Sequence, residues 1–177
     1  MAKSRRKVFL AVGIFAVAFF VFSRFNSLCP VQTKIETVEG TSLAGLFEPG
    51  SRVRAQYGYY ACHEPARGDL VLYRYAGEKN LLIKIIKAVP GDTMALKKNP
   101  QGTRILINGS ALTNSSGEVY QLSDERARLL SLYVRDYHGV IPEAAYLIFG
   151  NLVTGTLDSS QFGLVSRQDL IGRAFEQ

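Results

Sequence analysis

The stretch TRILINGSALT, Thr103 to Thr113, carries the clearest folding signal in the chain. It holds two apolar runs that are joined by the pair Asn108-Gly109. This pair suits the two left-handed positions of a type I′ turn, whose twist matches that of the strands it connects. The stretch therefore predicts a β-hairpin.

The sequence on both sides of this hairpin favours further short strands. Several runs are rich in β-branched and aromatic residues, and Gly, Pro and Asp separate them. The predicted strands are Arg52 to Gly58, Asp69 to Tyr75, Leu81 to Val89, Thr93 to Lys97 and Ala144 to Gly150. We therefore expect one mainly antiparallel β domain.

One amphipathic helix is predicted within this domain, from Ser123 to Arg135. Ser123 is a good N-cap, and Asp124 and Glu125 place acidic side chains in the first turn. The surrounding segment, Asn114 to Pro142, is interpreted as a soluble insertion between sheet elements.

The N-terminal region has the pattern of a membrane anchor. The apolar run Val8 to Phe22 has no charged residue and follows a basic cluster made of Lys3, Arg5, Arg6 and Lys7. A bilayer core of ~30 Å needs about 20 helical residues, so the helix is expected to continue to Leu28. The basic cluster favours a cytoplasmic N-terminus, which predicts that the rest of the chain is exported.

Two alternatives to a retained anchor are a cleaved secretory signal and a lipoprotein signal. The Ala-x-Ala sequence from Ala16 to Ala18 lies inside the apolar run, where cleavage is not expected. A lipoprotein signal needs small residues just before Cys29, and Ser27-Leu28 stand there instead. The predicted organisation is a basic tail and transmembrane anchor at 1–28, a linker at 29–35 and an exported domain at 36–177.

The positive charge of the chain is concentrated around this apolar run. The formal net charge is +6, and five basic residues flank the run: Lys3, Arg5, Arg6, Lys7 and Arg24. A nucleic-acid-binding surface needs Lys and Arg clustered on the folded domain, which the sequence does not suggest. The lipid bilayer is therefore the expected partner, and nucleic acid is not.

Cys29 and Cys62 would both lie in an oxidising compartment if the domain is exported. The sequence leaves open whether they form a disulfide. It contains no C-x-x-C, and His63 follows Cys62 directly, which does not suit a shared metal ion. We predict no metal site and no cofactor.

Ser42 is the first candidate for a nucleophile, within VEGTSLAGLFEPG. Gly40 and Gly45 flank it and allow a tight backbone that a substrate can approach closely. The spacing does not fit the G-x-S-x-G elbow of other hydrolases, and neither His63 nor His138 lies in a stretch that suggests a catalytic imidazole. Taken alone, Ser42 is better interpreted as an ordinary turn residue.

Lys84 is the candidate base, within LLIKIIKAVPGD. Strand alternation places Lys84 on one face with Leu82 and Ile86, so that its neighbours are apolar. Burial lowers the pKa of a lysine, and a neutral amine is a competent base. The alternative is a strand lysine that points to solvent, which we expect for Lys87.

Together and in this order, these stretches resemble the signal peptidase I family. VEGTSLAGL resembles its nucleophile motif V-x-G-x-S-M-x-P and places the nucleophile at Ser42. RGDLVLY, Arg67 to Tyr73, resembles R-G-D-[IV]-V-x-F, and KIIKAVPGD resembles K-R-V-x-G-x-P-G-D with Lys84 as its lysine. ILINGSAL matches the hairpin that follows, and GNLVTGTLDSSQFG with DLIGRA resembles G-D-N-R-x-N-S-x-D-S-R-x-x-G with I-I-G-K-A.

The resemblance implies a signal-peptidase-type antiparallel β domain behind one N-terminal transmembrane helix. It also implies a Ser-Lys dyad, in which Ser42 is the nucleophile and Lys84 the general base. The expected location is the bacterial inner membrane, with a single pass and the catalytic domain on the periplasmic side. Exported precursor proteins or prepilin are the implied substrates.

The family's supporting positions can be transferred to this sequence. Thr156 occupies the place of a serine hydroxyl that orients the lysine, and Asp158 matches an aspartate that helps to position the site. Gly40 stands where some members carry a hydroxyl that serves as a second oxyanion donor. Leu43 and Ile83 would line small pockets that bind an Ala-x-Ala substrate.

Several positions depart from the family's motifs. Gly45, Leu43 and Ile85 replace the proline, the methionine and the arginine of the first boxes. In the last box, Asn151 and Val153 replace Asp and Arg, and Ser160 replaces its final Arg, so that Asp158 is expected to lack its usual cationic partners. With the short chain and single anchor, these departures resemble the TraF-like branch that matures pilin subunits in conjugative transfer.

Two rival interpretations remain. A LexA-like self-cleaving protein uses the same Ser-Lys chemistry, but it needs an Ala-Gly cleavage loop before the nucleophile, and Ala44-Gly45 follows Ser42. A catalytically inactive anchored scaffold of an envelope or pilus machine is the other alternative, because the last motif is degraded.

Overall fold

The computed structural model describes residues 29–75 and 81–176. The predicted anchor and its basic tail, residues 1–28, lie outside the described residues. Within the described ranges, no helix combines the length and the apolar character that crossing a bilayer requires. Val31–Gln177 form one compact unit.

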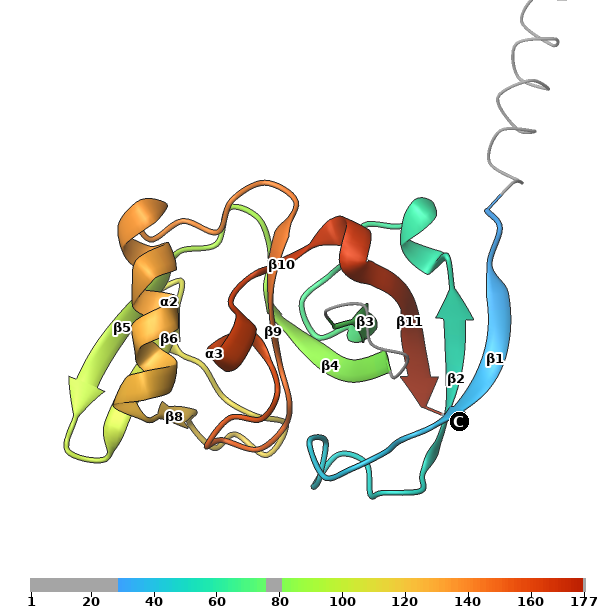
Figure 1. The fold of residues 1–177 in the computed structure, drawn as a ribbon, viewed down its shortest axis with the longest axis horizontal. Coiled ribbons are helices and arrows are strands. Elements are labelled where there is room, and N and C mark those ends of the chain that lie inside the picture. The colour runs from blue at the N-terminus through green and yellow to red at the C-terminus, as the bar shows by residue number, and fades with distance from the viewer. Residues whose placement is uncertain (1–28, 76–80, 177) are drawn as a thin grey trace, which may run out of the picture. The chain divides into compact units, whose positions relative to one another are not determined.

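The larger of two sheets has seven strands in the order β1-β2-β11-β3-β4-β9-β10 (Figure 1). Every neighbouring pair is antiparallel. Its strands are β1 (Gln32–Thr37), β2 (Arg52–Tyr57), β11 (Leu170–Glu176), β3 (Leu70–Arg74), β4 (Leu81–Ala88), β9 (Ala145–Phe149) and β10 (Val165–Ser166). The mainly antiparallel β fold predicted from the sequence is confirmed.

The smaller sheet contains the predicted hairpin. Its four strands are β5 (Met94–Asn99), β6 (Gly102–Ile107), β7 (Ser110–Ala111) and β8 (Gln121–Leu122), and β6 pairs with each of the other three. Asn108 and Gly109 connect β6 to β7 with φ values of 51° and 79°. Both turn residues are thus left-handed, as the type I′ prediction requires.

The helix predicted at 123–135 is confirmed as α2 (Asp124–Asp136), and the Ser123 side chain accepts a hydrogen bond from the backbone N–H of Arg126. The other helical segments are α3 (Ser159–Phe162) and two 3-10 turns, η1 (Tyr59–Ala61) and η2 (Arg167–Asp169).

The segment 114–142 was interpreted as a soluble insertion, but part of it is buried in the core. Helix α2 runs alongside β5 and β6 (Figure 1). Tyr120, Leu130 and Ile141 are at most 1% exposed and pack in one apolar cluster with β6 residues. The segment therefore completes the core of the smaller sheet.

Two other boundaries differ from the sequence predictions. The expected linker, 29–35, overlaps β1, so that residues 32–35 already belong to the larger sheet and pair with β2. The C-terminal strand β11 was not among the predicted strands, yet it lies between β2 and β3. Its burial alternates along the strand, because one face packs on the core.

Strand β4 connects the cores of the molecule. Ile85, Ile86 and Ala88 each belong to a different buried cluster. Because β4 lies between β3 and β9 in the middle of the sheet, consecutive residues on both of its faces are buried. Lys84 lies at the start of this fully buried run.

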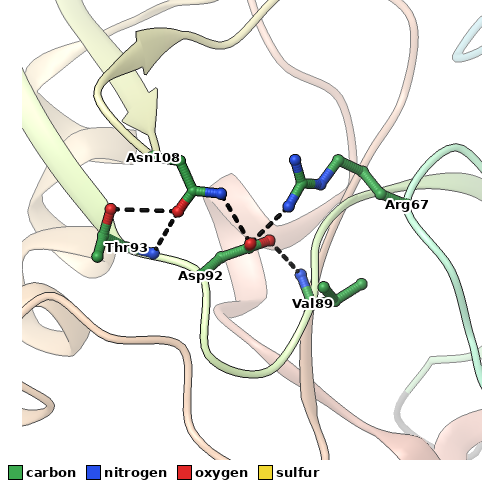
Figure 2. A network of polar contacts seen from close by, with 5 residues as sticks. All are labelled: Arg67, Val89, Asp92, Thr93 and Asn108. Atoms are coloured by element: carbon green, nitrogen blue, oxygen red, sulfur yellow. Dashed lines mark hydrogen bonds and ion pairs between the residues drawn. The ribbon is translucent and has the colours of Figure 1, made fainter.

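A polar network secures the connection between the two sheets (Figure 2). Asp92, which follows β4, accepts hydrogen bonds from the backbone N–H of Val89 and from the side chain of Asn108 in the hairpin turn. Arg67, just before β3, forms an ion pair with the same carboxylate. One buried side chain thus joins three segments that are far apart in the sequence.

The two cysteines, Cys29 and Cys62, are both disulfide-bonded. The sequence leaves this point open, and the bonded state fits an oxidising compartment.

Candidate active site

Ser42 lies in a tight turn between β1 and β2. The loop is closed at its base by hydrogen bonds from Val38 N–H to the Ser51 carbonyl (2.8 Å) and from Gly50 N–H to the Val38 carbonyl (2.9 Å). Gly40, two residues before Ser42, has a φ of 69°, which other residues adopt only at a cost. Leu43 is 1% exposed and anchors the turn in the core beside Ser42.

Asn151, which lies just after the end of β9, holds this turn in place through hydrogen bonds. Its backbone N–H donates to the Ser42 carbonyl (2.6 Å), and its side-chain amide donates to the Ala44 carbonyl (2.9 Å). Its side-chain oxygen accepts a hydrogen bond from the Ser115 N–H (2.9 Å). Because Asn151 is 2% exposed, these bonds are shielded from water and hold Ser42 firmly.

Gly150 lies between the Ser42 turn and Thr156. A methyl group added at its Cα would come within 2.5 Å of both the Ser42 carbonyl oxygen and the Thr156 hydroxyl oxygen. A side chain cannot fit there unless one of these groups moves. Gly150 therefore allows the end of β9 to approach both segments closely.

The Ser42 turn and β4 line one cavity of about 470 Å³. Both members of the predicted dyad, Ser42 and Lys84, contribute to its wall. Three further residues that the sequence analysis singled out also line it: Gly40, Leu43 and Ile83. The cavity has two acidic side chains as well, Glu36 and Glu39.

Lys84 is almost fully enclosed, with 1% of its surface exposed. Burial lowers the pKa of its amine from 10.5 to about 8, and the carboxylate of Asp158 acts in the opposite direction. A pKa near 8 leaves an appreciable fraction of neutral amine at physiological pH, which is the form that can accept a proton.

Asp158 is fully buried and receives several hydrogen bonds. One oxygen accepts from the N–H of Gly150 (3.2 Å) and from the N–H (2.8 Å) and hydroxyl (2.6 Å) of Thr156. The other accepts from the N–H (3.0 Å) and hydroxyl (2.7 Å) of Ser160. This set of donors satisfies both oxygens of the buried carboxylate.

Thr156 and Asp158 are not part of the cavity wall; they form a layer behind it. Thr156 was expected to orient the lysine, but its hydroxyl proton is directed to Asp158. Within the part of the chain that the structure describes, no hydrogen bond joins Thr156 to Lys84. The link between this layer and Lys84 is the electrostatic interaction of the lysine with Asp158.

Comparison with known proteins assigns the chain to a family. The family described as "Signal peptidase, peptidase S26" matches residues 5–176. The chain belongs to this signal peptidase family. Its members are serine endopeptidases, so the chain is a hydrolase of that class.

Individual relatives of the signal peptidase family are distant in sequence. A signal peptidase I of Leptolyngbya laminosa is 25% identical over 148 residues, which cover 77% of this chain and 64% of that protein. Signal peptidase IB of Staphylococcus aureus is 22% identical over 181 residues, which cover 98% of this chain and 88% of that protein. A crystal structure of a signal peptidase I from Enterococcus faecalis V583 is 18% identical, with a TM-score of 0.40, and covers 63% of this chain and 97% of that one.

For this signal peptidase, the sequence analysis did not identify two residues that support the site. Asn151 was noted only as a departure from the last motif, whereas it clamps the Ser42 turn. Arg126 of α2 was not noted, whereas its guanidinium donates hydrogen bonds to the Thr156 carbonyl and the Ser160 hydroxyl. A partner 30 residues away on a separate helix leaves no local signal in the sequence.

Proposed function

We propose that this chain is a membrane-bound serine endopeptidase that cleaves exported precursor proteins with Ser42 as nucleophile and Lys84 as general base. One observation carries the proposal: an enclosed lysine, whose pKa lies near 8, lines the same cavity as a serine held on a rigid turn. Family membership supports the same chemistry.

The mechanism follows from the two side chains. The neutral Lys84 amine takes the hydroxyl proton as the Ser42 oxygen attacks the scissile carbonyl carbon. The resulting ammonium gives that proton to the nitrogen of the leaving amine as the C–N bond breaks, which leaves an ester on Ser42. The same amine then activates water, which hydrolyses the ester and regenerates both groups.

The negative oxygen of the tetrahedral intermediate needs a donor that is already in place. The backbone N–H of Ser42 is the proposed donor, and among the described residues no hydrogen bond occupies it. Gly40 offers no hydroxyl at the position where some family members have one, so a second donor has to come from elsewhere. Leu43 and Ile83 line the cavity and are proposed to select small side chains of the substrate.

The proposed site of action is the bacterial inner membrane. The uncharged run at 8–22 with its basic flank supports a single-pass anchor, with the catalytic domain on the periplasmic side. Two kinds of precursor fit this location: proteins with an ordinary signal peptide and pilin precursors of a conjugative system. The motif departures at Gly45 and Asn151 support the TraF-like, pilin-processing specialisation.

The test is cleavage of a purified precursor by the full-length chain in detergent. We expect Ser42→Ala and Lys84→Met each to lower kcat by more than about 1000-fold, because each removes one half of the dyad. Matched controls are Ser116→Ala, an exposed serine, and Lys97→Met, an exposed lysine on β5. Both controls should cleave at nearly the wild-type rate.

The outcomes separate the alternatives. Wild-type cleavage by Ser42→Ala or Lys84→Met would overturn the assigned roles. A wild-type chain that cleaves neither a signal-peptide substrate nor a prepilin would favour the inactive scaffold. Preference for one of the two substrates, measured as a ratio of kcat/KM, decides between general signal-peptide removal and pilin processing.

A further inference from the structure

The buried carboxylate of Asp158 needs positive charge close by. A buried charge is tolerated when it is paired and hydrogen-bonded. Asp158 has no exposed surface, and its five hydrogen-bond donors all come from neutral groups. Ser160 stands where the family's last motif has an arginine, so the usual local cation is missing.

Arg126 supplies a cation from a different element. Its guanidinium nitrogen Nη1 donates to the Thr156 carbonyl and to the Ser160 hydroxyl, both at 2.6 Å. The Ser160 hydroxyl in turn donates to Asp158 (2.7 Å). A continuous hydrogen-bonded chain thus runs from the first turn of α2 to the carboxylate.

The backbone is shaped to admit this guanidinium. Gly155 has a φ of 84°, and a Cβ added there would lie 2.9 Å from Arg126 Nη1 and 2.9 Å from the Ser160 hydroxyl. Glycine therefore leaves the space that the arginine fills. The contact is built into the loop rather than being a chance approach of a surface side chain.

We infer that Arg126 is a positioning residue of the proposed Ser42–Lys84 site: it fixes Thr156 and Asp158 behind Lys84 and counterbalances the carboxylate's charge. The inference rests on the proposed function. It makes α2, which contributes no residue to the cavity wall, part of the device that keeps Lys84 basic.

Other charged and titratable groups lie around the hydrogen-bonded series that links Arg126 to Asp158. Tyr120 lies close enough to Asp158 for the carboxylate to raise the pKa of its phenol, in addition to the larger effect of burial. Lys87 lies over the Tyr120 ring, 5.3 Å from its centre. Glu36 and Glu39 line the same cavity as Lys84. These groups stay in place when Arg126 is changed, so their effect is common to all variants.

The consequence of losing Arg126 has a definite sign. Asp158 favours the charged form of Lys84 and so raises the lysine pKa, against the effect of burial. A guanidinium beside Asp158 offsets part of that effect. Without it, the ammonium form of Lys84 is favoured and the pKa of the amine moves up.

The direct test is an NMR titration of the Lys84 amine in the full-length chain in detergent, in a Ser42→Ala background. Lys84→Met identifies the signal. We expect Arg126→Gln to raise the titration midpoint by about half a pH unit or more. Arg128→Gln, an exposed arginine on the same helix, removes the same charge and should leave the midpoint unchanged. Equal midpoints in the two variants would overturn the inference.

A kinetic arm uses the active enzyme. The pH at which kcat/KM reaches half its plateau should rise in Arg126→Gln by the same amount as the NMR midpoint, and Arg126→Lys should restore part of the difference. A lower plateau without a shift would indicate a purely structural role and would also count against the inference. If Arg126→Gln does not fold, Ser160→Ala breaks the same chain and should shift the midpoint in the same direction.

The two hypotheses fail in distinguishable ways. If Ser42→Ala and Lys84→Met cleave as well as wild type, the proposed function is wrong, but the NMR titration still decides whether Arg126 tunes Lys84. If the dyad is essential and the midpoints are equal, only the role of Arg126 is wrong.

Discussion

Burial of the Lys84 amine destabilises the folded chain while it prepares the proposed base. Its pKa falls from 10.5 in water to about 8 in the fold. Below pH 8 the amine is protonated in both states, so the full cost of burying the charge is present. Between pH 8 and 10.5 the unfolded chain binds more protons, and stability rises with pH until the cost is gone.

This cost gives a prediction for the stability of a variant. The pKa difference corresponds to a free energy of the order of 3 kcal/mol, so Lys84→Met should raise the free energy of unfolding at pH 7 by about 2 to 3 kcal/mol. The gain should shrink toward pH 10. Urea denaturation at both pH values measures it, with the exposed Lys97→Met as control. A variant that is less stable than wild type at pH 7 would contradict the assigned burial cost.

The sequence identifies the cavity residues of the site better than the layer behind them. Ser42 and Lys84 lie in local motifs whose residue types and order are informative by themselves. Asn151 and Arg126 act through backbone carbonyls of distant segments, and such contacts depend on how the loops fold rather than on a motif. An arginine in the first turn of a helix looks in the sequence like an ordinary solvated side chain.

At the scale of elements, prediction succeeded where local chemistry decides the structure. Asn108-Gly109 specified its hairpin because few other pairs adopt two left-handed residues. Ser123 specified the start of α2. Strand β1 was missed because its residues are mostly exposed on both faces, so it lacks the apolar alternation of a core strand. Its place depends on pairing with β2.

The Asp92 network makes the arrangement of the two sheets sensitive to one side chain (Figure 2). Asp92 is 7% exposed and holds the β4–β5 connection to the hairpin through Asn108. Its removal breaks the ion pair with Arg67 and the hydrogen bond from Asn108, and it leaves the half-buried backbone N–H of Val89 without its acceptor. We expect Asp92→Ala to lower the free energy of unfolding by about 2 to 4 kcal/mol.

Urea denaturation measures this loss, and Asp136→Ala is the matched control. Asp136 forms an exposed ion pair with Arg135, so its removal should leave stability nearly unchanged. Equal effects of the two substitutions would show that the Asp92 network does not hold the sheets in place.

At the scale of the whole molecule, the proposed catalytic and anchoring roles belong to different parts of the chain. Ser42, Lys84 and the groups behind them all belong to the compact unit Val31–Gln177. That unit should therefore fold and cleave without residues 1–30. The truncation removes Cys29, so the truncated chain also carries Cys62→Ser, which prevents new disulfides between chains. The full-length control carries both Cys29→Ser and Cys62→Ser.

We expect the truncated chain to cleave a soluble peptide substrate within about threefold of this control. Toward a precursor embedded in lipid vesicles its rate should fall by about 100-fold, because a shared membrane raises the effective concentration of enzyme and substrate. The ratio of the two rates separates the effects: loss on both substrates means that residues 1–30 are needed for the fold. Equal rates on vesicles would mean that these residues do not tether the enzyme, which would remove the basis for the proposed anchor.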